Sequence, residues 1–234
     1  MSQSKRLERP VTAGEVMQQL ERDPQYVARR KQADAQWQQA VKKNKLAAEP
    51  VIADLKVVGF SVESLDELRR SGVRYKAAIP VLLKWLPVVE NTDIKEAIVR
   101  ALSVPWAKPT AVQPLIVEFQ TASESASGLK WTIGNALAIV ADDSVFNEIA
   151  ELVRDKRHGK AREMLAVALG NMDDPQVVDL LIELLRDDEV AGHALIAIGK
   201  LGAQKARPVV EPFLNHPKAW IRAKAKRVLA RLDR

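Results

Sequence analysis

Apolar residues recur in this chain at intervals of about 30 residues, and this repeat limits the possible folds more than any other feature. The positions that define it, called repeat positions below, are 35, 32, 29 and 31 residues apart and are occupied by Ala101, Ala136, Ala168, Ala197 and Val228. The positions seven before, three before and one after each of them are also apolar. These offsets share one face of an α-helix. Five amphipathic helices of one register are therefore predicted.

A second apolar pattern lies upstream of each of these helices and predicts a partner helix. Its two positions are three residues apart; the first is occupied by Leu82, Ile116, Ile149, Leu181 and Val210, and the second by Trp85, Phe119, Leu152, Leu184 and Phe213. Pro175 and Pro217 stand where a helix begins, and Gly170 and Gly202 stand where one ends. The predicted unit is helix, turn, helix, and the five units are residues 76–109, 110–143, 144–174, 175–203 and 204–234.

The first 75 residues fit the repeat less well. We expect disorder in residues 1–10 and an irregular helical cap in residues 11–75, continuous with the solenoid, because a stack of repeats needs atypical terminal units. Thr12 and Glu15 have the spacing of a capping box. A second helix is predicted from Pro24 to about Asn44, and a third helix is predicted to begin at Pro50.

The repeat resembles the HEAT family, in particular the short HEAT-like form of bilin-lyase proteins. The resemblance lies in residues 166–170 (Ala-Val-Ala-Leu-Gly), in residues 194–202 (Ala-Leu-Ile-Ala-Ile-Gly-Lys-Leu-Gly) and in the pair Ile221-Arg222. It implies an all-α fold, a right-handed α–α superhelix whose second helices line a concave surface. It also implies that a basic position six before the repeat position, occupied by Lys95, Lys130, Arg162 and Arg222, braces neighbouring units. It implies no particular activity, because this fold carries many functions.

Several chemistries have no support in the sequence. There is no cysteine, and the three histidines are far apart, so no metal-binding motif is visible. No phosphate-binding glycine loop, nucleophile elbow or cofactor fingerprint occurs. Paired carboxylates such as Asp142 and Asp143 stand at turns, where such residues cap the next helix. The sequence therefore favours a non-enzymatic protein without metal or cofactor.

Charge and hydropathy narrow the class of partner. No run of about 18 apolar residues and no apolar signal segment occurs, so we expect a cytoplasmic protein without a membrane span. The net charge of +6 equals the excess in residues 218–234, which hold seven basic residues and one acid. A second basic cluster between Arg29 and Lys45 is offset by acidic stretches elsewhere. The protein is therefore dipolar, which weakens a simple nucleic-acid interpretation.

One candidate site lies on the predicted solvent side of the second helices. The position five before the repeat position points away from the core, and it is occupied by Glu96, Trp131 and Glu163 in the first three units. The position one before the repeat position carries Arg100 and Asn135. A large aromatic residue on a solvent face is typical of a partner-binding surface. The alternative is that Trp131 packs onto a neighbouring unit.

A second candidate, a basic contact, lies on the last predicted helix and comprises Arg222, Lys224, Arg227 and Arg231. Such a helix either contacts phosphates or an acidic protein, or serves as a solubilising end cap whose cations favour a helix C-terminus.

Three functional hypotheses follow. The first is a scaffold that presents its concave surface to a protein partner. The second is a nucleic-acid-binding protein similar to the DNA glycosylases built from HEAT-like repeats, although their catalytic motif has no residue-by-residue match here. The third is a chromophore-handling protein similar to bilin lyases. The sequence leaves the partner and the oligomeric state open.

Overall fold

The computed structural model describes residues 11–123 and 125–233. The expected disorder of residues 1–10 lies outside the described residues, as does Arg234. The described chain forms thirteen α-helices joined by short 3-10 segments and turns, and it contains no strand. The prediction of an all-α protein is confirmed.

The chain divides into two compact units between Leu46 and Ala47. The first unit holds α1 (Ala13–Arg22) and the beginning of α2 (Pro24–Val57). The capping box before α1 is present: the Thr12 hydroxyl accepts the Glu15 N–H at 3.3 Å, and the Glu15 carboxylate accepts the Thr12 N–H at 2.9 Å. The division lies inside the predicted cap of residues 11–75, and the cap assignment stays a prediction.

Helix α2 differs from the sequence interpretation at Pro50. A new helix was expected to begin there, but α2 continues through this residue to Val57. Proline inside a helix removes one backbone hydrogen bond and usually bends or ends the helix. Here Val51 and Leu55, which follow it, are completely buried in the hydrophobic core. Their burial holds the turns after Pro50 in helical conformation, which local propensity could not indicate.

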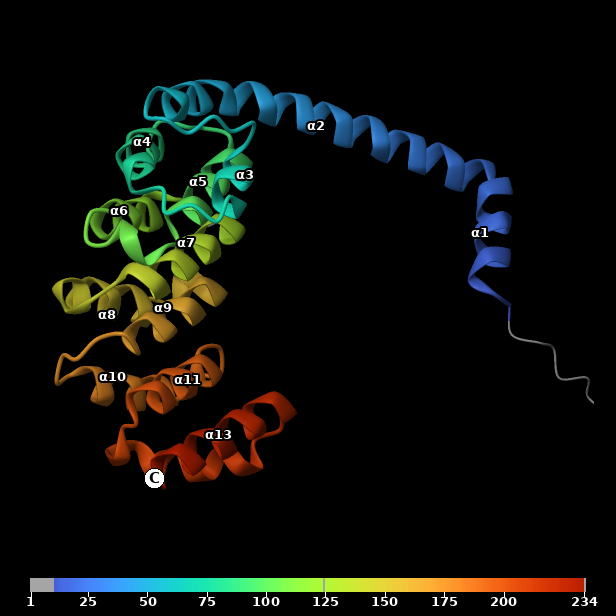
Figure 1. Ribbon diagram of the computed structural model, residues 1–234. Helices are drawn as coiled ribbons and strands as arrows, with labels where there is room; N and C mark the ends of the chain where they lie inside the picture. The colour runs from blue at the N-terminus through green and yellow to red at the C-terminus, as the bar shows by residue number, and fades with distance from the viewer. Residues whose placement is uncertain (1–10, 124, 234) are drawn as a thin grey trace, which may run out of the picture. The chain divides into compact units, whose positions relative to one another are not determined.

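The second unit is a stack of helical hairpins. After α3 (Leu65–Arg70), the first helices of the hairpins are α4 (Ile79–Trp85), α6 (Val112–Thr121), α8 (Phe146–Arg154), α10 (Val177–Leu184) and α12 (Arg207–Val210). The second helices are α5 (Thr92–Leu102), α7 (Ser127–Val140), α9 (Arg162–Leu169), α11 (Ala191–Leu201) and α13 (Ala219–Leu232). Figure 1 shows the two sets as two layers, each helix lying beside its counterpart in the next hairpin. We call α5, α7, α9, α11 and α13 the second-helix layer.

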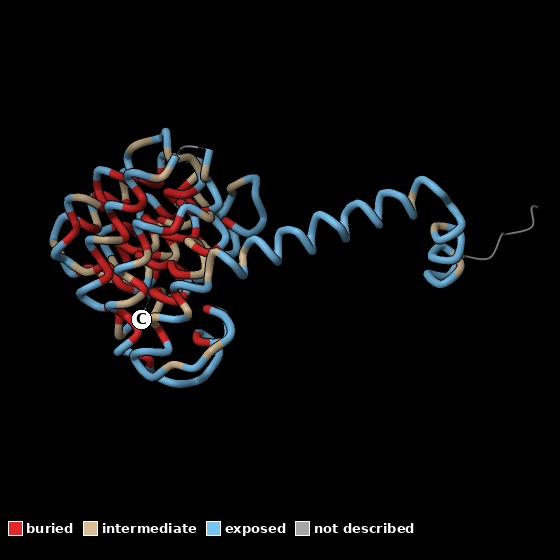
Figure 2. The backbone as a smooth tube through the Cα atoms, turned by 90° about the horizontal axis from the view of Figure 1, so that it is seen from above, coloured by how far each residue is buried: buried red, intermediate tan, exposed pale blue. Residues whose placement is uncertain are grey.

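The core lies between the two layers, where Figure 2 shows the buried residues of the stack gathered. All twenty apolar residues of the repeat register in the second helices are buried. Eight of the ten register residues in the first helices are buried too, while Trp85 and Phe213 are half-buried. The spacing of apolar residues therefore identified the faces that pack together.

Two glycines set the register between neighbouring second helices. A Cβ atom added to Gly170, after α9, would lie 3.0 Å from the Cα atom of Ala197 on α11. A Cβ atom on Gly199 of α11 would lie 2.9 Å from a methyl carbon of Val228 on α13. In both cases a glycine two residues after one repeat position packs against the repeat position of the next helix. The stacking of α9 on α11 is thus repeated by α11 on α13.

Candidate functional site

Helix α7 presents a row of side chains to solvent. Trp131, Asn135 and Ile139 are four residues apart and therefore lie on one side of the helix. Trp131 is 46% exposed and Ile139 is 39% exposed. This exposure favours the interpretation of Trp131 as a surface residue over the alternative that it folds onto the neighbouring unit.

The row borders a hollow of about 350 Å³ at the surface of the second-helix layer. The lining residues come from α3, α5, α7 and the turn after α5, and they are Arg69, Arg100, Ser103, Trp131, Thr132, Asn135 and Ile139. The structure thus brings together Arg100, Trp131 and Asn135, which the sequence proposed as one patch. Ile139 was missed, although its spacing from Asn135 places it on the same side of α7. Arg69 was missed because α3 lies outside the repeat.

Both arginines of this hollow already have carboxylate partners. Arg100 forms an ion pair with Glu96 at 2.6 Å, and Arg69 forms one with Asp66 at 2.8 Å. The hydrogen bond from Arg69 lowers the pKa of Asp66. The Asn135 amide donates a hydrogen bond to the backbone carbonyl of Trp131 at 2.8 Å. Glu96 is half-buried and does not line the hollow, so its contribution here is to balance the charge of Arg100.

A second hollow of about 570 Å³ adjoins the first. It is lined by Lys108, Ala138, Ile139, Gly170, Asn171, Asp173, Lys200 and Leu201. Ile139 lines both hollows, which therefore lie side by side on the surface formed by α5, α7, the turn after α9, and α11. We use the word groove for their combined lining residues.

The polar contacts of the second hollow involve amides and carbonyls. Lys200 donates to the side-chain oxygen of Asn171, whose amide donates to the Ala138 carbonyl at 2.6 Å. Lys108 donates to the Ala141 carbonyl at 3.5 Å. Neither lysine forms an ion pair with a carboxylate within the described residues. The two ammonium groups therefore keep their charge available to a ligand.

Glu163 lies apart from the groove. Its carboxylate is 3.9 Å from the ring of His193, and it lines neither hollow. Burial lowers the pKa of His193, whose ring also lies 5.8 Å from that of Trp220. The geometry does not join Glu163 to Trp131, and its role in partner binding stays a prediction.

The four basic residues predicted on the last helix have different surroundings. Arg222 donates to the carbonyls of His216 and Pro217, both at 2.8 Å, and so holds the turn before α13. Lys224 is half-buried, and its charge contributes to the lowered pKa of His193. Arg227 and Arg231 are exposed and, in the part of the chain that the structure describes, pair with no carboxylate.

The basic position six before the repeat position contacts the next unit in three hairpins. Lys95 pairs with Glu118 at 2.5 Å, and Lys130 lies 3.3 Å from Nδ1 of His158. Arg162, which is 1% exposed, pairs with Asp187 at 2.8 Å and Glu189 at 2.5 Å, and it also donates to the Val153 carbonyl. These contacts are those of structural bracing. They are distinct from the groove.

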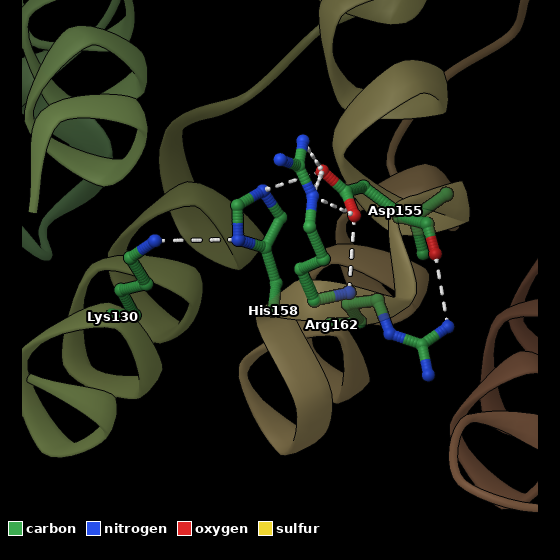
Figure 3. Close-up of polar contacts among 6 residues, drawn as sticks. Lys130, Asp155, His158 and Arg162 are labelled. Carbon is green, nitrogen blue, oxygen red and sulfur yellow. Dashed lines mark hydrogen bonds and ion pairs between the residues drawn. The ribbon is translucent and has the colours of Figure 1, made fainter. Parts of the chain in front are cut away.

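Figure 3 shows the His158 ring between Lys130 and Asp155. An ammonium group can only donate, so the contact with Lys130 makes Nδ1 the acceptor and leaves the Nε2 proton facing Asp155, 3.7 Å away. Hydrogen bonds from the Arg157 side chain and backbone hold the pKa of Asp155 well below its usual range. The Asp155 carboxylate therefore stays anionic and orients the ring of His158. These contacts give the cluster of Lys130, Asp155 and His158 a structural role.

No group of three or more histidine, aspartate or glutamate side chains among the described residues is arranged to hold a metal ion. None of the described helices combines the length and the apolar character that crossing a bilayer requires.

One comparison with known proteins agrees with the repeat. The family model described as PBS lyase HEAT-like repeat matches residues 161–187, which contain α9 and α10. No curated protein matches the chain. Among solved structures, a designed armadillo repeat protein in complex with the peptide (KR)4 is similar, with 18% identity over 92% of this chain and 97% of that chain and a TM-score of 0.49.

The helical hairpins, their common register and the repeat match together define the class. The second unit is an α-helical repeat solenoid, and residues 161–187 within it match a HEAT-like repeat.

Proposed function

We propose that this protein is a scaffold that binds an extended segment of a partner protein in the groove along α7. The observation that carries the proposal is the half-exposed Trp131 in a hollow that shares Ile139 with a second hollow, lined by the turn after α9 and by α11. Large exposed apolar residues inside a hollow are characteristic of interaction sites. Amides beside them supply hydrogen bonds for a peptide backbone.

The surroundings of Trp131 support binding by a preformed site. The residue lies on a regular helix whose opposite side is buried, including Ile133, Ala136 and Leu137. Side chains on such a helix lose little freedom when a ligand arrives, which favours affinity. Solenoids also tolerate variation of this exposed side because it does not contribute to the core.

The test is the substitution Trp131→Ala. We expect a change in the free energy of unfolding below about 1 kcal/mol, because nearly half of the side chain is exposed. The affinity for a partner recovered with the wild-type chain from its own cell extract, then purified, should fall by about tenfold or more, as for other tryptophan hot spots. Isothermal calorimetry measures this loss.

The matched control is Val117→Ala. Val117 is 53% exposed and lies on α6, in the layer of first helices. This variant should bind the partner as tightly as the parent. A purified partner that binds the Trp131→Ala variant with the parental affinity would contradict the proposal.

A further inference from the structure

The exposed and half-buried positions on the outer side of the second-helix layer change in chemistry from α7 to α13. The relevant positions are one before and three after each repeat position, and we call them groove positions. They are occupied by Asn135 and Ile139 on α7, Val167 and Asn171 at α9, Ile196 and Lys200 on α11, and Arg227 and Arg231 on α13. These positions hold one amide and one apolar residue at α7 and again at α9, one apolar and one basic residue at α11, and two basic residues at α13. Trp131 lies one turn before Asn135 on the same side of α7.

Three of these positions are neighbours in the structure. Ile139, Asn171 and Lys200 each stand three residues after a repeat position, and all three line the second hollow. Lys200 also donates to Asn171 directly. These three residues therefore form a continuous row across α7, the end of α9 and α11.

Helix α13 extends this row. The contact of Gly170 with Ala197 is repeated, one hairpin later, by the contact of Gly199 with Val228. Helix α13 is therefore stacked on α11 in the same register as α11 on α9. This register places Arg231 next to Lys200 in the row, in the same way that Lys200 lies next to Asn171. Figure 1 shows α9, α11 and α13 in this order along one layer.

The cations at this end of the groove form no ion pair with a carboxylate of the described residues. Arg69 and Arg100, beside Trp131, are paired with Asp66 and Glu96. By contrast, Lys108, Lys200, Arg227 and Arg231 have no carboxylate partner there, and Asp173 is the one acid in the lining of the groove. The surface is thus charge-balanced where it is apolar and positively charged at its other end.

We infer that the bound segment carries an apolar side chain for Trp131 and Ile139 and, further along the same chain, acidic side chains for Lys200, Arg227 and Arg231. This inference rests on the proposed function and names the chemistry of its ligand. An apolar anchor alone would leave the cations unmatched, and a purely acidic segment would leave Trp131 uncovered.

The stack also sets the spacing within the ligand. Packed helices are about 8–10 Å apart, and an extended chain advances about 3.3 Å per residue. Two helix spacings separate α7 from α11, which corresponds to about five or six residues between the anchor and the first acid. Three spacings separate α7 from α13, which corresponds to about seven to nine residues. Peptides with the acids on either side of the anchor are needed to determine the direction in which the segment binds.

The test is a selection from displayed peptides with the intact chain as bait. The library carries Leu, Phe, Ser or Gln at one central position and Glu, Gln or Lys at positions four to ten on either side. We expect joint enrichment of Leu or Phe with Glu at a separation of about five to nine residues. For an enriched peptide, replacing its acids by Gln should weaken binding by about tenfold, since exposed ion pairs contribute about 1.5- to 5-fold each. Raising the salt should reduce this difference.

Variants of the protein locate the effect. The double variant Lys200→Gln, Arg231→Gln should lose most of the preference for Glu over Gln peptides, with Arg227 retaining the remainder, and should keep the preference for an apolar anchor. The matched control is Lys218→Gln, Lys226→Gln, which removes the same charge from exposed positions outside the row. The control should keep the tenfold preference for Glu.

The outcomes separate this inference from the proposed function. If Trp131→Ala weakens every selected peptide but Glu and Gln peptides bind equally to the parent, the acidic ligand is wrong and the scaffold stands. If nothing is enriched, or if Trp131→Ala has no effect, the proposed function itself fails. Enrichment of Lys in the selected peptides, or an equal loss of the preference for Glu in the two double variants, would contradict the inference that the ligand is acidic. Tighter binding of a single-stranded 20-mer DNA that needs Arg231 but not Trp131 would replace the peptide by a nucleic acid.

Discussion

Arg162 offers a demanding test of how the hairpins are held together. Its side chain is almost fully buried and reaches Asp187, Glu189 and the Val153 carbonyl. Arg162→Ala removes these bonds and leaves a cavity beside two carboxylates. Removing one partner of a fully buried ion pair destabilises a protein by about 3–5 kcal/mol. The side chains of Asp187 and Glu189 keep 19% and 35% of their exposure, so water compensates in part. We expect a loss of about 3 kcal/mol.

Urea unfolding followed by circular dichroism measures this loss, and Arg154→Ala is the matched control. Arg154 also joins two hairpins, through hydrogen bonds of 2.8–3.3 Å to Glu183, but both side chains are about half exposed. Exposed pairs contribute about 1 kcal/mol or less. Equal losses in the two variants, or a loss below about 1 kcal/mol for Arg162→Ala, would refute the view that burial makes the Arg162 contacts strong.

The loss of stability caused by Arg162→Ala should depend on pH. The hydrogen bond from Arg162 lowers the pKa of Asp187. A carboxylate whose pKa is depressed by folding stabilises the protein above its unfolded pKa of about 3.9, and this stabilisation is lost as the pH falls through the folded pKa. The difference in stability between the wild type and Arg162→Ala should therefore narrow below about pH 4. An unchanged difference between pH 7 and pH 3 would contradict this assignment.

Two further predictions concern His193 and Gly170. Burial lowers the pKa of His193, so the unfolded chain takes up the proton first and stability should fall as the pH drops below about 6.5. His193→Gln should flatten this slope between pH 7 and 5 in thermal melts; an equal slope would exclude the residue as its source. Gly170→Ala should lose about 1–3 kcal/mol in urea unfolding because the new Cβ would lie 3.0 Å from the backbone of Ala197. A variant as stable as the parent would show that α9 and α11 separate easily.

The sequence predicted the parts of this structure that depend on periodicity. Each second helix was located by four apolar positions, all of which are buried. The same register placed Trp131 on the exposed side and within reach of Arg100 and Asn135. Such predictions succeed because one helix face must be apolar wherever it packs on a neighbour.

Features that depend on contacts between distant residues could not be predicted in this way. The register identified Lys95, Lys130 and Arg162 as a basic column, but their partners lie on helices and turns of the next hairpin that follow no common spacing. The continuation of α2 through Pro50 depends on burial that the local sequence does not reveal. The pairing of Glu96 with Arg100 is different, because it is a local contact between residues four apart on one helix, which their spacing could have indicated.

The basic column has a consequence for the order of the hairpins. At one junction a lysine meets a glutamate, at the next a lysine meets a histidine, and at the third an arginine meets two carboxylates. The hairpins share a fold, but their junctions are not interchangeable. Deleting, duplicating or exchanging one hairpin would place a cation against a partner of the wrong length or charge. The linear sequence of the units is thereby fixed, although each of them has nearly the same shape.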